Sequence, residues 1–373
     1  MIYFDNAATT FPKPKCVINN TLKCISKYCG NPGRGSHKLS LKTSEKIYET
    51  RERIAKLIGI DCAENIVFTQ NATYALNLSI KTTIKPNTHV IISDMEHNSV
   101  LRPIYSLSKK TGVEYSIFDT HGNIEENIEK CLKTNTKCII STLASNVIGR
   151  EIPLPVLSDI SKKHGLSLIV DSSQLIGHKD INLRESSCSV LCAPGHKALF
   201  GIQGVGFAVF LDDEIRDSYI EGGSGNDSLN PNMPALLPER FEAGTLPSPS
   251  IISLGEGIKF IEEVGIFEIE DKLTRLTERC AKMINNVKNA VLYDYGNGVI
   301  SFNITSVPAE VISGELDKFG ICTRSGFHCA PSAHKIIGTS KIGTVRISFS
   351  YLNQMRELDE FYKALKSISK KYS

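Results

Sequence analysis

Two short segments near the middle of the chain carry side chains that could hold one cofactor. Apolar residues 168–170 run directly into Asp171, so this segment predicts a buried strand that ends in a carboxylate. A second apolar run, 191–193, leads into a turn that presents His196 and Lys197. A lysine amine can form a Schiff base, and a carboxylate across the strand ends can keep a pyridine nitrogen protonated. This pairing indicates a site for pyridoxal 5'-phosphate.

The elements that must position this pair follow an α/β pattern between about residue 60 and residue 210. Strands are expected at 66–69, 89–93, 114–118, 138–142, 167–170, 189–193 and 205–211. Helices are expected at 73–81, 99–110, 124–132 and 155–164. This alternation predicts a mainly parallel sheet with helices on both faces and a ligand crevice at the carboxyl ends of the strands.

The flanking segments predict further parts. An amphipathic helix is expected over 40–58, a Gly-, Asn- and Pro-rich loop over 222–249, and one long helical segment over 251–287. A second unit should follow, with strands 291–293, 299–304 and 344–348 and helices 308–319 and 354–370. We therefore expect an N-terminal segment (1–30) packing with the small domain, a large cofactor-binding domain (31–250), and a linker helix with a small C-terminal α+β domain (251–373).

Composition limits the possible partners. The chain has 373 residues, 41% of them hydrophobic, and a net charge of +3, which favours neither nucleic acid nor a membrane surface as partner. No apolar run approaches the roughly 20 residues of a membrane span, and no signal peptide is visible at the start. A cytoplasmic location is the resulting expectation.

The cysteines and histidines narrow the chemistry. Eleven cysteines without a secretion signal do not predict a disulfide framework, and ten of them are expected to be small buried residues. Cys329 is the exception, because it lies in a loop-like segment rich in small residues. No set of histidines has metal-binding spacing, so no metal site is expected.

The chain resembles class V aminotransferase-fold enzymes of the cysteine desulfurase and selenocysteine lyase group, in the branch with a short catalytic loop. The resemblance runs from YFDNAAT at residues 3–9, through DSSQ at 171–174 and GHK at 195–197, to RIS at 346–348. It implies the fold type I of pyridoxal-phosphate enzymes, with a large domain built on a mainly parallel seven-stranded sheet and a smaller C-terminal α+β domain.

The resemblance assigns roles around the cofactor ring. It implies that Lys197 forms the Schiff base, that Asp171 faces the pyridine nitrogen and that Gln174 contacts the ring oxygen. His97 matches the imidazole that stacks on the ring and moves protons. Asn146 matches the asparagine near the cofactor oxygen and the substrate carboxylate.

Phosphate binding is expected where the strand 66–69 meets the next helix. A helix N-terminus offers free N–H groups, so Ala72 and the hydroxyl of Thr73 are candidates. The resemblance adds His196, although Pro194 stands where the family often has a serine and cannot donate a hydrogen bond. It also implies that Thr245, in FEAGT, reaches the phosphate of the neighbouring subunit, which predicts a homodimer.

The resemblance also selects a reaction. Cys329, in RSGFHCAP at 324–331, matches the catalytic cysteine of desulfurases, and Arg346 matches the clamp for the substrate carboxylate. Arg324 and His37 are further substrate-side candidates, with His37 in the segment Arg34-Gly35-Ser36-His37. The implied enzyme takes sulfur from L-cysteine as a Cys329 persulfide and releases L-alanine.

Alternatives remain at this point. A selenocysteine lyase would share all of these residues, and another class V aminotransferase or C–S lyase would not need Cys329. A catalytically silent sulfur-relay scaffold is the non-enzyme alternative, but a scaffold does not need a Schiff-base lysine. A sulfur-acceptor protein is an expected partner, and the sequence does not identify it.

Overall fold

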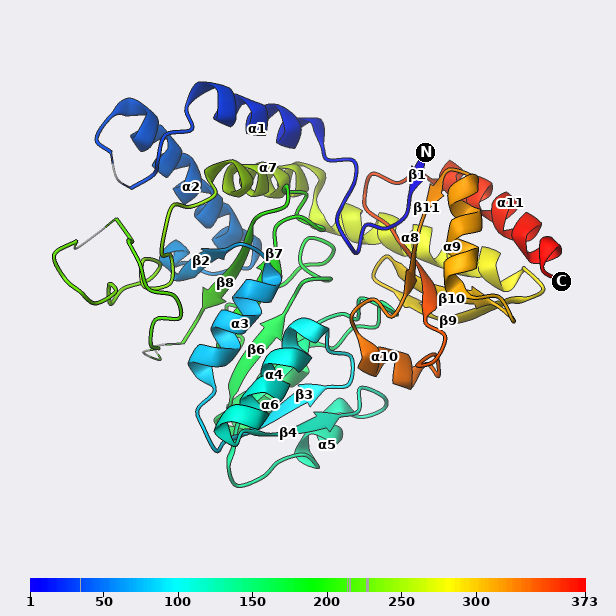
Figure 1. Cartoon of the computed structure of the whole chain (residues 1–373), viewed down its shortest axis with the longest axis horizontal. Coiled ribbons are helices and arrows are strands. Elements are labelled where there is room, and N and C mark those ends of the chain that lie inside the picture. The colour runs from blue at the N-terminus through cyan, green and yellow to red at the C-terminus, as the bar shows by residue number, and fades with distance from the viewer. Residues whose placement is uncertain (34, 213, 215, 226–227) are drawn as a thin grey trace.

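A seven-stranded sheet forms the centre of the larger part of the molecule (Figure 1), in the order β2-β8-β7-β6-β5-β3-β4. The computed structural model describes residues 1–33, 35–212, 214, 216–225 and 228–373. The strands are β2 (Ile66–Thr69), β3 (His89–Ser93), β4 (Glu114–Phe118), β5 (Thr136–Thr142), β6 (Ser167–Asp171), β7 (Val190–Pro194) and β8 (Gly206–Phe210). Only β8 runs antiparallel to its neighbours within the described part of the sheet. The expected mainly parallel seven-stranded sheet is thus confirmed.

Helices cover both faces of this sheet, because alternate residues of each strand point to opposite sides. Val190 and Cys192 of β7 belong to the core with α3 (Ala72–Thr83) and α4 (Asn98–Thr111). Leu191, between them, belongs to the core on the other side. That core includes residues of α2 (Lys38–Leu57), α6 (Leu154–His164) and α7 (Ser248–Val264). Burial on both faces explains the almost continuous apolar runs of these strands.

The C-terminal part holds a second, antiparallel sheet in the order β12-β13-β10-β9. Its strands are β9 (Ala290–Gly296), β10 (Val299–Ile304), β12 (Arg324–Gly326) and β13 (Thr344–Ser348). The helices of this part are α8 (Ile266–Asn285), α9 (Ala309–Lys318), α10 (Pro331–Ile336) and α11 (Met355–Lys371). No helix among the described residues is long and apolar enough to cross a bilayer.

The N-terminal segment connects the two parts. β1 (Ile2–Tyr3) pairs in parallel with β11 (Ile321–Cys322) of the C-terminal part. The following helix α1 (Lys15–Lys27) lies instead along α7, on the side of the large sheet (Figure 1), where Asn20 donates a hydrogen bond to Glu256 at 2.8 Å. The proposed domain boundaries near residues 30 and 250 stay a prediction.

Two expectations about helices were wrong. The single helix expected over 251–287 is broken into α7 and α8 at Gly265, whose φ of +92° is a left-handed conformation that favours glycine. Helical periodicity continues across this residue, so the pattern alone did not show the break. The second helix, α5 (Ile124–Glu129), ends three residues before the end of the helix predicted over 124–132.

The expectation that ten cysteines are buried was also wrong in part. Cys29 and Cys62 are exposed, and Cys16, Cys131 and Cys322 are half-buried. The remaining five besides Cys329 are buried: Cys24, Cys138, Cys188, Cys192 and Cys280. Cys29 and Cys62 lie outside the helices and strands, and any labelling experiment on Cys329 must distinguish it from these two thiols.

A buried glutamate joins the end of β3 to β5. Oε1 of Glu96 accepts hydrogen bonds from the hydroxyl of Ser93 and from the backbone N–H of Thr142, whereas Oε2 has no partner among the described residues. Burial raises the pKa of Glu96 to about 8, above its ordinary 4.5. The contact fixes the turn that presents His97, the next residue.

Glu96→Gln should therefore change how stability depends on pH. Between pH 4.5 and about 8 the native protein holds a proton on Glu96 that the unfolded chain has lost, so this residue stabilises the fold less as pH rises. The melting temperature of the variant should be close to that of the wild type at pH 5 and higher by several degrees at pH 9. An equal difference at both pH values in a thermal melt would contradict an ionisable, buried Glu96.

Candidate active site

A cavity opens at the carboxyl ends of β3, β5, β6 and β7, where the topology predicted a crevice. It has an empty volume of about 540 Å³, which includes the solvent in its open mouth. Eight of the residues expected around the cofactor line it, namely Ala72, Thr73, His97, Asn146, Asp171, Gln174, His196 and Lys197.

Lys197 and Asp171 are the central charges of this cavity. Asp171 ends β6, is nearly fully buried, and accepts a hydrogen bond from the backbone N–H of Ser173 at 2.9 Å. Burial lowers the pKa of Lys197 to about 8, and the charge of Asp171 opposes that decrease. A substantial fraction of the Lys197 amine is therefore neutral and nucleophilic slightly above pH 7.

The N-terminal segment holds the backbone on which Lys197 stands. The carbonyl of His196 accepts hydrogen bonds from the hydroxyl of Thr9 at 3.2 Å and from the amine of Lys13 at 2.7 Å. The carbonyl of Lys197 accepts one from the hydroxyl of Thr10 at 2.7 Å. These contacts span more than 180 residues of sequence, and no motif pointed to Lys13 beyond its position after the N-terminal YFDNAAT segment.

His97 is held in one tautomer. Its Nδ1 accepts a hydrogen bond from the backbone N–H of Ser99 at 3.1 Å, so a neutral ring carries its proton on Nε2. Burial lowers the pKa of His97 to about 4, and the positive charge of Lys197 opposes protonation further. The hydroxyl of Ser99 lies 2.9 Å from the same Nδ1 and 2.8 Å from the hydroxyl of Thr73, which ties the ring to the start of α3.

The start of α3 has the features of an anion site. The side chain of Asn71 caps the helix by accepting a hydrogen bond from the N–H of Tyr74 at 3.0 Å. Other backbone N–H groups of the first turn lie at this end of α3, which lines the cavity. A Cβ at Gly206 would collide with the backbone of Asn71 and Ala72, so glycine is required for the close approach of β8. The opposite wall supplies His196, whose buried Nδ1 has no partner among the described residues.

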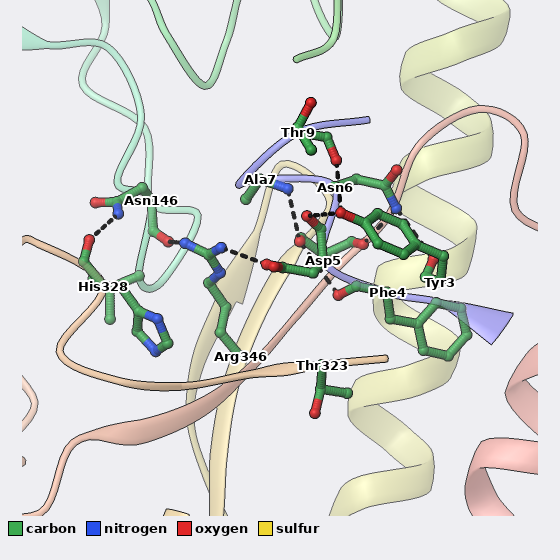
Figure 2. A network of polar contacts seen from close by, with 12 residues as sticks. Tyr3, Phe4, Asp5, Asn6, Ala7, Thr9, Asn146, Thr323, His328 and Arg346 are labelled. Carbon is green, nitrogen blue, oxygen red and sulfur yellow. Dashed lines mark hydrogen bonds and ion pairs between the residues drawn. The ribbon is translucent and has the colours of Figure 1, made fainter. Parts of the chain in front are cut away.

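Three polar contacts tie the cavity residues Gln174 and Asn146 to segments outside the cavity lining. The amide of Gln174 donates to the carbonyl of Ala7 at 3.2 Å, which again involves the N-terminal segment. The side-chain amide of Asn146 donates to the backbone carbonyl of His328 at 2.7 Å, and the backbone carbonyl of Asn146 accepts from Nη1 of Arg346 at 3.0 Å (Figure 2). Asn146 therefore connects the cavity to the loop that carries Cys329.

Cys329 lies exposed on this loop, next to the cavity but not among the residues that line it. Its carbonyl accepts the N–H of Asn98, the residue after His97, at 2.7 Å. His328 and Cys329 both have left-handed backbone conformations, with φ of 48° and 57°, which non-glycine residues rarely adopt. Such strain at successive residues is typical of functional loops.

His328 directly precedes Cys329 on this loop. Burial and the charge of Arg346 keep the pKa of His328 far below the ordinary value, so the ring is neutral. Its Nε2 contacts Thr344 of β13. Arg324 is exposed and lies in register with Arg346 across β12 and β13, so the structure brings the two substrate-side arginines together.

Like Cys329, the expected site residues Arg324 and Arg346 are not among the residues that line the cavity, and neither are His37 and Thr245. His37 is exposed and caps α2 by accepting the N–H of Ser40 at 3.4 Å, and its neighbour Arg34 lies outside the described residues. Thr245 is exposed as well. Its segment is anchored by Glu242, which forms a buried ion pair with Arg51 at 2.7 Å.

One cluster of possible metal ligands occurs in the described part of the chain: Asp94, Asp119 and His121. Asp94 already accepts hydrogen bonds from the backbone and hydroxyl of Thr120. The cluster is largely exposed, and none of its members lines the cavity.

Known proteins share this arrangement over the whole chain. A family model described as Aminotransferase class-V matches residues 2–361. The probable cysteine desulfurase of Pyrococcus abyssi is 31% identical, across 99% of this chain and 94% of its own length. That of Borreliella burgdorferi is 30% identical, across 100% and 93%. The solved apo structure of cysteine desulfurase from Thermococcus onnurineus NA1 has a TM-score of 0.92 and 30% identity, covering 99% of this chain and 95% of that one.

The resemblance and the fold type predicted from the sequence are confirmed, and this chain belongs to the class V aminotransferase family.

Proposed function

We propose that this protein is a pyridoxal-phosphate-dependent cysteine desulfurase, which takes sulfur from L-cysteine as a persulfide on Cys329 and releases L-alanine. One observation carries the proposal: the strained loop with the exposed Cys329 is hydrogen-bonded through its backbone to Asn98 and to Asn146, beside a cavity that contains a buried lysine and carboxylate. The names of the relatives across the full chain support the same reaction.

The family implies pyridoxal phosphate, and the residues present fit it. Lys197 would bind it covalently, Asp171 would face its ring nitrogen, and the start of α3 with the unpartnered Nδ1 of His196 would hold its phosphate. Gln174 and Asn146 would contact its ring oxygen. When bound, the cofactor supplies an electron-accepting ring that stabilises negative charge at the substrate α-carbon.

The side chains of the chain then divide the remaining tasks. Arg346 binds the α-carboxylate of L-cysteine. The neutral Lys197 amine takes the proton from the α-carbon, because burial holds its pKa near 8 rather than 10.5. His97, with Nδ1 already accepting a hydrogen bond, holds a transferable proton on Nε2.

Sulfur transfer is a displacement at sulfur. The Cys329 thiolate attacks the substrate sulfur, an S–S bond forms, and the carbon–sulfur bond breaks. The electron pair of the broken bond stays with the carbon fragment, which is reprotonated and leaves as L-alanine. The exposure of Cys329 then allows an acceptor protein to collect the terminal sulfur.

Selenocysteine lyase is the second candidate, because every residue above serves it equally. Parallel measurement of alanine release from L-cysteine and L-selenocysteine separates the two. A silent scaffold is disfavoured by the depressed pKa of Lys197, since keeping an amine buried beside Asp171 serves no structural purpose.

Lys197→Ala should retain its fold but lose both the visible absorbance of covalently bound cofactor and alanine formation. In the wild-type apoprotein, the rate at which added pyridoxal phosphate gives that absorbance should rise about tenfold per pH unit below pH 8 and then level off, because only the neutral amine attacks. Lys335→Ala, at an exposed position, is the control. Borohydride-stable attachment of the cofactor to Lys197→Ala would contradict the assignment.

Cys329→Ser should bind cofactor and still respond spectrally to L-cysteine, but alanine formation should fall by at least about a hundredfold because a neutral hydroxyl cannot replace a thiolate. The loss should be smaller with L-selenocysteine. Brief treatment of wild-type protein with L-cysteine should add one sulfur to the peptide with Cys329, as read by mass. Cys62→Ser, which removes an exposed thiol elsewhere, should behave as the wild type. Wild-type turnover by Cys329→Ser would favour a C–S lyase or aminotransferase.

The exposed Thr245 supports a homodimer with shared sites. Thr245→Val should retain less cofactor after dialysis than the wild type, and sedimentation should show that the cofactor-loaded protein is a dimer. A monomer with full cofactor occupancy and full activity would remove Thr245 from the site.

A further inference from the structure

Arg346 has an unusual polar environment for a buried cation. Its side chain is 2% exposed, and it uses only part of its donor capacity on the protein. Nη1 donates to the carbonyl of Asn146 at 3.0 Å, and Nη2 donates to Oδ1 of Asp5 at 2.8 Å (Figure 2). Nε is buried and has no partner among the described residues. The guanidinium is therefore held at two nitrogens and unsatisfied at the third.

Arg346 is buried near a second positive charge, so a nearby carboxylate is needed to stabilise its charged form. Arg324 lies directly opposite Arg346 in the register of β12 and β13, a like-charge pairing that destabilises a sheet. Burial and Arg324 lower the pKa of Arg346, whereas the charge of Asp5 raises it. Among the described residues, Asp5 is the carboxylate that forms an ion pair with Arg346.

The backbone of Asp5 is fixed from several sides. Asp5 forms a parallel bridge with Ser348, two residues after Arg346 on the same strand end. The N–H of Ala7 donates to the hydroxyl of Ser348 at 2.8 Å, and the hydroxyl of Tyr3 donates to the carbonyl of Asp5 at 3.2 Å. These contacts hold the backbone that carries the Asp5 carboxylate close to the guanidinium of Arg346. The Asp5 side chain is only 20% exposed.

We infer that Asp5 is a positioning residue for the substrate carboxylate, acting through Arg346. By holding Nη2 at one side while Asn146 holds Nη1, Asp5 fixes the plane of the guanidinium and leaves Nε with the remaining N–H groups for the incoming α-carboxylate. Asp5 stays in place when the substrate binds, because its backbone cannot move without breaking the bridge to Ser348. The inference rests on the proposed function, in which Arg346 binds that carboxylate.

The test compares Asp5→Asn with the wild-type holoenzyme on two substrates, L-cysteine and its methyl ester, which lacks the carboxylate charge. Asparagine keeps the shape and one acceptor oxygen but removes the charge. For L-cysteine, KM should rise about tenfold or more while kcat changes less than about threefold. KM for the ester should be nearly unchanged. Equal effects on both substrates would mean a merely structural role and would overturn the inference.

A matched control uses another ion pair of similar length. Asp294 bonds Arg150 at 2.7 Å, and neither residue lines the cavity. Asp294→Asn should leave KM for both substrates at the wild-type values. If it raises KM for L-cysteine as Asp5→Asn does, the effect is not specific to Arg346, and the inference fails.

Arg346→Gln separates this inference from the proposed function. If Arg346→Gln leaves KM for L-cysteine unchanged, the clamp itself is wrong. If it raises KM and Asp5→Asn does not, only the role of Asp5 is overturned. If Asp5→Asn does not fold, Asp5→Glu keeps the charge on a longer arm, and the same KM increase confined to L-cysteine is expected. Wild-type KM values for Asp5→Glu would then overturn the inference.

Discussion

The site depends on keeping a lysine amine out of water while leaving it reactive. Burial alone would drive the Lys197 amine to a pKa far below 10.5, and the carboxylate of Asp171 limits that decrease. The two groups meet because parallel strands β6 and β7 end at the same edge of the sheet. The imidazoles of His97 and His196 also line the cavity, and burial lowers the pKa of each, so they stay neutral and add no positive charge beside Lys197.

The N-terminal segment is the second requirement. Residues 3–13 contact the carbonyls of His196 and Lys197, the amide of Gln174 and the guanidinium of Arg346. Lysine, amide and guanidinium stand on different elements, and this segment is in hydrogen-bond contact with all three. It thus sets the distance between the cofactor side of the cavity and the substrate side.

Local pattern and family resemblance together accounted for the residues at strand ends. Strands such as β3 and β10 were predicted with their observed bounds, because their buried apolar runs are bounded by polar turns. Asp171 and Lys197 followed from the same argument. The pattern could not show the ion pair of Asp5 with Arg346, since 341 residues separate them and only the tertiary fold brings them together. It also could not show that His328 is buried, because its segment has the composition of an open loop.

The pairing of β1 with β11 has a consequence for synthesis. Ile2 and Tyr3 pair with Ile321 and Cys322, so β1 has no partner until the ribosome has added more than 300 further residues. At about 5–20 residues per second, a ribosome needs roughly 15–60 s to reach that point. During this interval Phe4, fully buried in the finished protein, also lacks the rings of Phe349 and Phe361 against which it packs. β1 thus takes its native place only after the distant strand β11 has been made.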